Sequence, residues 1–140
     1  MAKSTINSYK KGVWGEFSLY IRSRDADTNG ICICCTCGKK LFWKGVECQA
    51  GHFVPGRTNN ILFDESIVHA QCSHCNEYLG GNGWAYAKFM MSKYGYDYAT
   101  LDEIMARKHK TRKFTIEELK QLKKQFISLR KEICKEKGLC

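Results

Sequence analysis

Proline and long apolar runs are nearly absent from this sequence of 140 residues. It contains one proline, and no stretch approaches the roughly 18 consecutive apolar residues that a bilayer span requires. With 44% hydrophobic and 26% charged residues, the composition is that of a folded chain rather than a disordered one. We therefore expect one soluble domain with a modest core and no membrane partner.

A secretory signal is also missing, because residues 1–11 are polar and hold no apolar segment followed by a small-residue cleavage site. We therefore expect a cytoplasmic location. Disulfides are disfavoured in that reducing compartment, and the nine cysteines form an odd number that cannot pair completely. Metal ligation by thiolates is the interpretation that we favour for them.

Four cysteines have the spacing of a structural zinc site. Cys34 and Cys37 form one C-x-x-C, and Cys72 and Cys75 form a second. Two such pairs supply a tetrahedral Cys₄ site for Zn²⁺, and Gly38 after the first pair can adopt the positive φ of a knuckle turn. The overlapping C-x-x-C that begins two residues earlier lacks such a glycine. The other thiols are expected to be buried small residues or tail residues: Cys32, Cys35, Cys48, Cys134 and Cys140.

Basic residues are concentrated toward the C-terminus. Residues 105–140 hold twelve Lys and Arg against four Glu, a net charge of +8. A basic helical tail on a small domain is typical of a polyanion binder, so we expect phosphate contacts from Lys120, Lys123, Lys124 and Arg130. A lysine-rich, solvated helix face is the alternative.

Hydrophobic periodicity predicts several helices. Residues 13–24 and 83–94 fit amphipathic helices, the second with Asn82 as its N-cap. Thr115 and Glu118 form a capping box for a C-terminal helix, whose apolar stripe can cover a core or form a dimer seam. Elsewhere we expect hairpin strands at 31–49, a loop at 51–60, a strand within 61–70, a short helix beginning near residue 72, and a helix at 100–109.

Several short strings occur in a characteristic order. They are F-S-x-Y-I-R-x-R-D at 17–25, C-x-x-C-G at 34–38, Q-A-G-H at 49–52, F-D-E at 63–65, H-A-Q-C-x-x-C-N at 69–76 and G-N at 81–82. Together they resemble the phage NinG/Rap recombination nucleases over residues 14–104. A zinc knuckle, a histidine at a strand end and C-x-x-C-N opening a helix are also similar to the ββα-metal (HNH, or His-Me finger) endonucleases, such as endonuclease VII.

This resemblance implies roles for two residues. His52 would be the general base that deprotonates the attacking water, and Asn76 would help to hold a catalytic Mg²⁺ or Mn²⁺. An imidazole that titrates near pH 6.5 and a hard cation both suit phosphodiester hydrolysis. A zinc-bound or core histidine is the alternative for His52, and a helix-capping amide is the alternative for Asn76.

The sequence departs from the family pattern at Gly51, where many ββα-metal nucleases carry an Asp or His as a metal ligand. Glycine has no side chain that could coordinate an ion. The replacement carboxylate is expected to be Glu65 or Asp64 in the F-D-E string, with Glu47 as a third candidate. The alternative for each is an ordinary surface charge.

Two further residues are candidate DNA contacts. Arg57 follows the histidine in a loop, and its guanidinium group can bind a phosphate bidentately. His69 is expected to face the active groove and contact phosphate, with a half-buried strand residue as the alternative. Asn82, despite the family likeness, is expected to act mainly as the helix N-cap.

These observations predict an α+β protein: an N-terminal helical arm (1–30), a zinc-braced ββα-metal, treble-clef-like core (31–95) and a basic helical region (96–140). The resemblance implies a phage-encoded endonuclease that acts as a homodimer on branched DNA, such as a Holliday junction, in the host cytoplasm. The alternatives are a non-catalytic zinc-finger DNA-binding protein and an HNH enzyme that nicks ordinary duplex.

Overall fold

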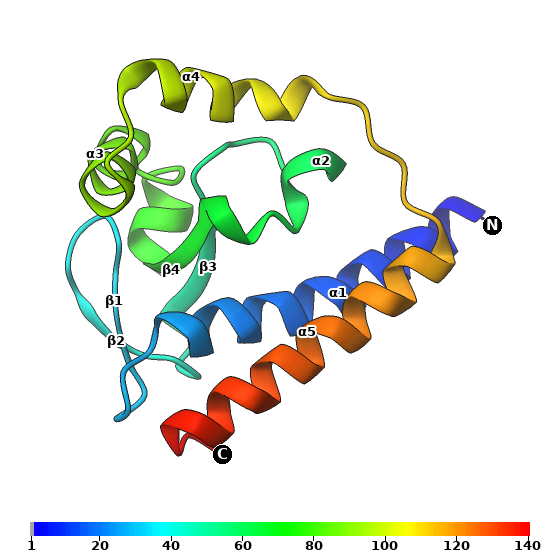
Figure 1. The fold of residues 1–140 in the computed structure, drawn as a ribbon, viewed down its shortest axis with the longest axis horizontal. Coiled ribbons are helices and arrows are strands. Elements are labelled where there is room, and N and C mark those ends of the chain that lie inside the picture. The colour runs from blue at the N-terminus through cyan, green and yellow to red at the C-terminus, as the bar shows by residue number, and fades with distance from the viewer. Residues whose placement is uncertain (1) are drawn as a thin grey trace.

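The computed structural model describes the backbone of residues 2–140 and the side chains from Thr5 onward. Five helices, four short strands and three single helical turns make up an α+β fold, as predicted (Figure 1). In chain order they are α1 (Ala2–Asp25), β1 (Ile31–Ile33), β2 (Lys40–Phe42), β3 (Cys48–His52), α2 (Asn59–Leu62), η1 (Glu65–Ile67), β4 (Val68–Cys72), η2 (His74–Tyr78), α3 (Gly83–Tyr94), α4 (Tyr98–Ala106), η3 (Arg107–His109) and α5 (Ile116–Lys137).

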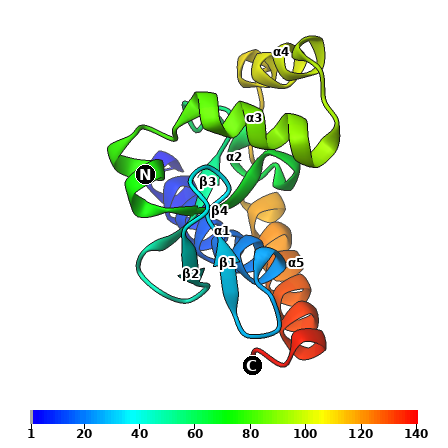
Figure 2. The same ribbon diagram turned by 90° about the vertical axis from the view of Figure 1, so that its left-hand side faces the viewer.

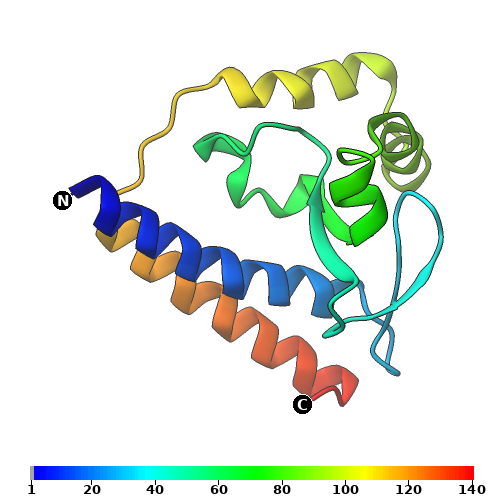
Figure 3. The same ribbon diagram turned by 180° about the vertical axis from the view of Figure 1, so that it is seen from behind.

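The two long helices, α1 and α5, lie side by side along one edge of the molecule (Figures 1 and 3). We predicted the first helix from residue 13, but α1 begins eleven residues earlier. The reason is that Ile6 and Tyr9 continue the apolar stripe of Val13 and Phe17 and pack against the same core. The N-terminal arm is therefore one continuous helix that ends at Asp25.

The capping box predicted for α5 is confirmed, since Thr115 and Glu118 satisfy each other's backbone amides. Leu119, Phe126 and Cys134 are buried on the face that the apolar stripe forms. Of the two uses predicted for this stripe, the fold therefore shows core covering.

A lysine near the end of α5 joins the two helices. Lys137 Nζ donates to the carbonyl oxygens of Ser23, Arg24 and Ala26, at 2.6 to 2.9 Å. Carbonyls at the end of a helix lack intrahelical partners, so a cation there satisfies them and complements the helix dipole. The basic tail of the chain thus holds the end of α1.

Two antiparallel strand pairs form the small sheets, β1 with β2 and β3 with β4. The hairpin expected within residues 31–49 matches β1 and β2. The strand expected within 61–70 begins only at Val68, and β3 runs through His52 into the predicted loop. The side chain of Asp64 accepts from the amide of Ser66 and turns the chain, so Ile67 reaches the core from a helical turn rather than from a strand.

The last two residues of the F-S-x-Y-I-R-x-R-D string, at the end of α1, have a structural role. Arg24 donates to the carbonyls of Glu65 and Val68, at 2.8 and 2.7 Å. Asp25 accepts the amide of Ala70 at 2.8 Å. These bonds satisfy polar groups at the outer edge of β4, which would otherwise be an unpaired strand edge. They fix the β3–β4 pair against α1.

The helix α3 covers one face of the β3–β4 pair (Figure 2) and has the predicted bounds. Asn82 occupies the N-cap position of α3, as predicted, but it has φ 51° and its side chain makes no capping bond. Its Nδ2 instead points at Cys75 Sγ, 3.6 Å away. The helix predicted at 100–109 starts earlier, since Asp97 caps α4 by accepting the amide of Thr100. None of the described helices has the length and hydropathy that a membrane span needs.

Candidate functional site

The four predicted cysteines form one cluster. The Sγ atoms of Cys34, Cys37, Cys72 and Cys75 all lie within 4.8 Å of one another, so together they could hold a metal such as zinc. The first pair comes from the turn between β1 and β2, and the second joins the end of β4 to η2. The cluster therefore ties the two small sheets together.

The knuckle geometry agrees with the role expected for Gly38. Its φ is 80°, and its amide donates to the carbonyl of Cys34 at 2.9 Å. Burial disfavours ionisation of Cys34, but hydrogen bonds from Thr36 and from the amide of Cys72 outweigh it and lower the pKa of the thiol to about 6. Amides and hydroxyls directed at a sulfur favour the thiolate form that binds metals.

The remaining thiols lie outside this cluster. Cys32, Cys48 and Cys134 are buried, Cys35 is half-buried and Cys140 is exposed. This agrees with the prediction of buried small residues and one tail residue.

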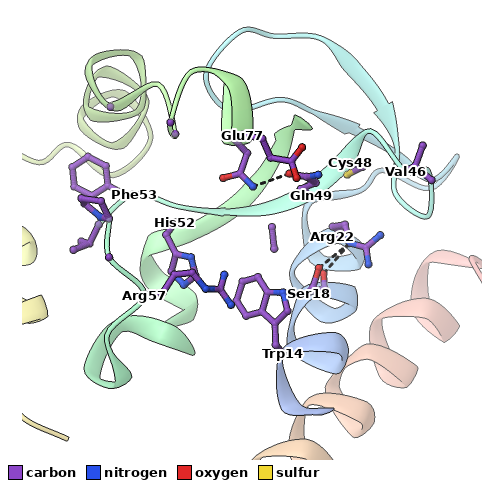
Figure 4. A pocket seen from close by; sticks show the side chains of 18 of the residues that line it. Trp14, Ser18, Arg22, Val46, Cys48, Gln49, His52, Phe53, Arg57 and Glu77 are labelled. Atoms are coloured by element: carbon purple, nitrogen blue, oxygen red, sulfur yellow. Dashed lines mark hydrogen bonds between the residues drawn. The ribbon is translucent and has the colours of Figure 1, made fainter. Parts of the chain in front are cut away.

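A cavity of about 810 Å³ opens beside β3 and is lined by residues from α1, β3, the loop after it and η2 (Figure 4). His52 lies on its wall, at the end of β3, with Trp14 and Arg57 next to it. Gln49 and Glu77 lie on another part of the wall. The histidine, the asparagine and the loop arginine singled out in the sequence thus line one cavity together with residues of α1.

Two contacts orient the imidazole of His52. Its ring stacks on Trp14, with centroids 5.2 Å apart and planes 16° apart, and its Nε2 lies 3.0 Å from the carbonyl oxygen of Leu62. A carbonyl can only accept, so Nε2 carries the proton and Nδ1 keeps a free lone pair. The carbonyl of Leu62 thus positions the ring.

Burial and the charge of Arg57 lower the pKa of His52, which the hydrogen bond to Leu62 and the charge of Asp64 partly oppose. The imidazole is therefore neutral near pH 7, and its free Nδ1 can accept a proton. The alternative of a zinc-bound histidine does not apply, because the four-cysteine cluster contains no histidine.

Asn76 is held by a side chain rather than serving as a helix cap. Its Nδ2 donates to Gln49 Oε1 at 2.8 Å, which leaves its Oδ1 to accept or ligate. Gln49 belongs to the Q-A-G-H string, but no pattern in the sequence singled it out. Its pairing with Asn76 across the cavity wall does so.

The carboxylates proposed to replace a ligand at Gly51 do not line the cavity. Asp64 caps the turn η1 and also pairs with Arg107 at 2.8 Å, and the exposed Glu65 follows it on that turn. Glu47 pairs with Lys39 at 3.1 Å. The carboxylate that does line the cavity is Glu77, directly after Asn76, and sequence reasoning missed it.

Close packing explains why position 51 is a glycine. A Cβ on Gly51 would lie 1.9 Å from Oε1 of the buried Gln71. Gln71 Nε2 donates to Thr36 and to the carbonyl of Gly81, so it holds the knuckle and the turn before α3 in place. An Asp or His at position 51 therefore has no room in this fold.

The prediction that His69 contacts phosphate is wrong, because the side chain is 1% exposed. Its Nδ1 lies 3.0 Å from the hydroxyl of Tyr86, and its Nε2 lies 2.6 Å from that of Tyr94. Burial lowers the pKa of His69 to about 4. His69 is thus a neutral core residue on the face of β4 that α3 covers.

The predicted DNA contacts fall into two places. The guanidinium carbon of Arg57 lies 4.4 Å from the ring centroid of Trp14, on the wall of the cavity. Lys120, Lys123 and Lys124 instead line a separate groove between α1 and α5. Arg130 is committed to Glu16 by an ion pair of 3.1 Å, so it is not a free phosphate contact.

Fold and site define a small α+β protein with a four-cysteine cluster that could hold a metal, next to a cavity with one neutral histidine. The model of the family "Bacteriophage Lambda NinG protein" matches residues 2–136, and the chain belongs to the NinG family.

Several curated relatives carry the name Protein ninG. The one from Salmonella phage P22 is 31% identical over 115 residues, and the one from Escherichia phage lambda is 30% identical over the same length. Both alignments cover 81% of this chain and 52% of the relative, so the chain spans about half the length of the curated relatives it matches. No solved structure matches the chain.

Proposed function

We propose that this chain is a metal-dependent DNA endonuclease of the ββα-metal type. The observation that carries the proposal is the state of His52: it is half-buried, neutral and oriented, and its Nδ1 has no hydrogen-bond partner in the described part of the chain. Its cavity also holds an asparagine, a carboxylate and several cations. A general base among such groups suits phosphodiester hydrolysis.

His52 Nδ1 would accept a proton from a water molecule as the water oxygen attacks the scissile phosphorus and the bond to the 3′ oxygen breaks. The carbonyl of Leu62 and the ring of Trp14 hold the imidazole in place during this transfer. Arg57 would donate to a non-bridging phosphate oxygen, for which a guanidinium group is well suited.

The oxygen atoms of Asn76 and Glu77 fit the hard ligand set that Mg²⁺ or Mn²⁺ prefers. When bound, such an ion would neutralise charge on the leaving 3′ oxygen. Gln49 accepts a hydrogen bond from Nδ2 of Asn76, so the Oδ1 of Asn76 faces away from this hydrogen bond. Glu77 would supply the carboxylate that cannot be placed at Gly51.

The cysteine cluster supports a structural Zn²⁺ as a second part of the proposal. A closed four-thiolate site keeps no open position for substrate, so this ion would hold the fold rather than react. It would fix η2, which carries both Asn76 and Glu77, against the knuckle.

Branched recombination intermediates are the substrate that the NinG/Rap resemblance favours. The family match supports the NinG part of this resemblance, and the choice of branched DNA rests on the resemblance itself, because the geometry of the cavity fits any DNA strand. Symmetric cuts on two strands of a junction need two active sites, so we propose that the protein acts as a homodimer.

The test is a cleavage assay with a labelled four-way junction and a linear duplex of matching sequence, each with Mg²⁺, with Mn²⁺ or without divalent metal. We expect metal-dependent cuts in the junction and few in the duplex. Equal cutting of both would favour a nicking enzyme. Binding without cleavage under every condition would contradict the endonuclease and favour a zinc-finger DNA-binding module.

A further inference from the structure

Several of the residues that line the cavity lie on one face of α1. Trp14, Ser18 and Arg22 line the cavity around His52. A smaller recess continues it past Trp14 and Arg57 and adds Lys10 and Lys11 to the lining. The two hollows share Trp14 and Arg57, so they form one continuous path along the helix.

The positions on this path recur at helical spacing. Residues 7, 11, 14, 18 and 22 follow one another at steps of three or four, which places them on a single side of α1. At 1.5 Å per residue this stripe is about 22 Å long. That length matches about six base pairs of a duplex.

Cations mark both ends of the path. Lys10 and Lys11 lie at one end, and Arg22 and Lys44 lie at the other, with His52 between them. Among the described residues, none of these four cations takes part in an ion pair, and the only carboxylate lining the path is that of Glu77. Their charge is therefore available to an anion.

Arg22 is already held in position. Its Nε donates to the carbonyl and hydroxyl of Ser18, and its Nη1 donates to the carbonyl of Trp43 at 2.8 Å. Nη2 remains to reach a ligand. Lys44 lies over the ring of Trp43, 4.9 Å from its centroid, and is exposed. This end of the path is thus preorganised rather than a set of mobile surface charges.

The lysines of α5 face elsewhere. The groove that they line touches α1 at Ser8, Tyr9 and Gly12. At 100° per residue, these positions point about 130° away from the stripe of Lys11, Trp14 and Ser18. One DNA strand therefore cannot follow the stripe and lie on the α5 lysines at the same point along α1.

We propose that one strand of a DNA substrate lies along this side of α1, with its backbone phosphates at Lys10 and Lys11 before the scissile bond and at Arg22 and Lys44 after it. These four cations form the α1 track. The proposal rests on the proposed function for its choice of DNA, and it replaces the C-terminal lysines as the principal phosphate contacts. Lys10 and Lys11 would set affinity without touching the reacting atoms.

The test is DNA binding by the zinc-loaded protein, measured by fluorescence anisotropy with a labelled four-way junction and no added divalent metal, between about 50 and about 200 mM salt. Lys10→Glu with Lys11→Glu should weaken binding more than about tenfold and reduce the slope of log K against log salt by about two units. Lys44→Glu should reduce it by about one unit. The matched control, Lys123→Glu with Lys124→Glu, changes the charge equally on α5 and should leave the slope unchanged.

An unchanged slope in the Lys10 and Lys11 variant, or an equal reduction in the α5 control, would overturn the α1 track. Zinc content and far-UV circular dichroism verify that each variant is folded. Because Lys44 lies at the other end of the path, its variant tests the track even if the double variant on α1 fails to fold. Cleavage is assayed separately, so a protein that binds along the track and never cuts would overturn the nuclease and leave the track standing.

Discussion

The two faces of the β3–β4 pair each carry a histidine, and the two rings differ in their hydrogen-bond partners. His52 and His69 come from neighbouring strands, but His52 pairs in register with Val68 and His69 with Gly51, so the two side chains point to opposite faces. Burial lowers the pKa of both. Two tyrosine hydroxyls occupy both ring nitrogens of His69, whereas a carbonyl occupies only one nitrogen of His52.

The covering elements cause this difference. α3 packs its aromatic residues against the His69 face and seals it, as the ring contacts with Tyr86 and Phe89 show. α1 crosses the His52 face with a polar stripe and leaves a cavity there. The closed face, which α3 covers, stabilises the β3–β4 pair. The open face, which α1 crosses, is accessible for a reaction. The following predictions test this division, from the largest expected effect to the smallest.

Removal of the proposed structural Zn²⁺ should unfold both faces of the β3–β4 pair. We expect about one Zn²⁺ per chain, bound by the four clustered cysteines, and chelation should unfold the protein because metal binding supplies folding free energy, about 10 kcal/mol or more in small zinc domains. Elemental analysis and circular dichroism before and after chelation measure this. Folded protein without zinc, or zinc retained by a Cys72→Ser, Cys75→Ser variant, would contradict the site.

Loss of the imidazole on the open face should abolish cleavage alone. His52→Ala should lower the cleavage rate by about 10²- to 10⁴-fold, because the ring moves a proton in the transition state. Junction affinity and zinc content should stay near those of the wild type. Since the pKa of His52 is lowered, the wild type should keep cutting below pH 6.5, where an ordinary histidine would be protonated. A variant that cuts at the wild-type rate would remove His52 from the mechanism.

Glu77→Gln should lower the metal-dependent rate by about 10²-fold or less, since one neutral oxygen remains where a charged ligand was. Raised Mn²⁺ should restore part of the loss. Asp64→Asn and Glu65→Gln are the matched controls, because these carboxylates lie off the cavity wall. If Asp64→Asn lost more activity than Glu77→Gln, the carboxylate assigned to the cavity would be the wrong one.

Local sequence patterns predicted the elements whose signals are local. The capping box of α5, the bounds of α3 and the knuckle at Gly38 all depend on residues a few positions apart. Two deviations also had local causes that the predictions overlooked: Ile6 and Tyr9 extend the apolar stripe of α1, and the side chain of Asp64 caps η1 two residues away. The packing of α1 against α5, more than a hundred residues away, has no such local signal.

The site divides in the same way. Motif spacing located the cysteine quartet, and the family resemblance singled out His52 and Asn76, which both line the cavity. Neither could show that Glu77 lines the cavity while Asp64 and Glu65 do not, since that depends on how η1 and η2 turn. Nor could the charge count distinguish α1, with few cations on one face, from α5, with many.

The closed face should make stability depend on pH. His69 has a pKa of about 4 in the folded state and 6.5 when unfolded, so between these values the unfolded chain binds the extra proton. The contribution of neutral His69 to the free energy of unfolding is fully present above pH 6.5 and is lost as the pH falls through 4. The total loss is about 3 kcal/mol. The charge of Asp25 opposes this shift, and those of Arg24 and Lys93 add to it. In urea unfolding of zinc-loaded protein, the free energy of unfolding of His69→Gln should depend less on pH than that of the wild type. Both proteins carry the same cysteines, so the thiols do not account for a difference between them. Equal pH dependence would mean that His69 accepts a proton while folded.

Crowding of the closed face by one methyl group should have the smallest effect. Gly51→Ala places a Cβ against Gln71 Oε1, and the buried glutamine must move from Thr36 and Gly81 to make room. Overpacking of this kind destabilises by about 1 to 3 kcal/mol. Gly15→Ala is the matched control: it lies in α1 with no atom within 4 Å of the new Cβ, and it should stabilise by about 0.5 to 1 kcal/mol. Urea unfolding at neutral pH compares the two. If Gly51→Ala were as stable as the wild type, packing against Gln71 would not explain the glycine, and the missing ligand at this position would reflect a change in function.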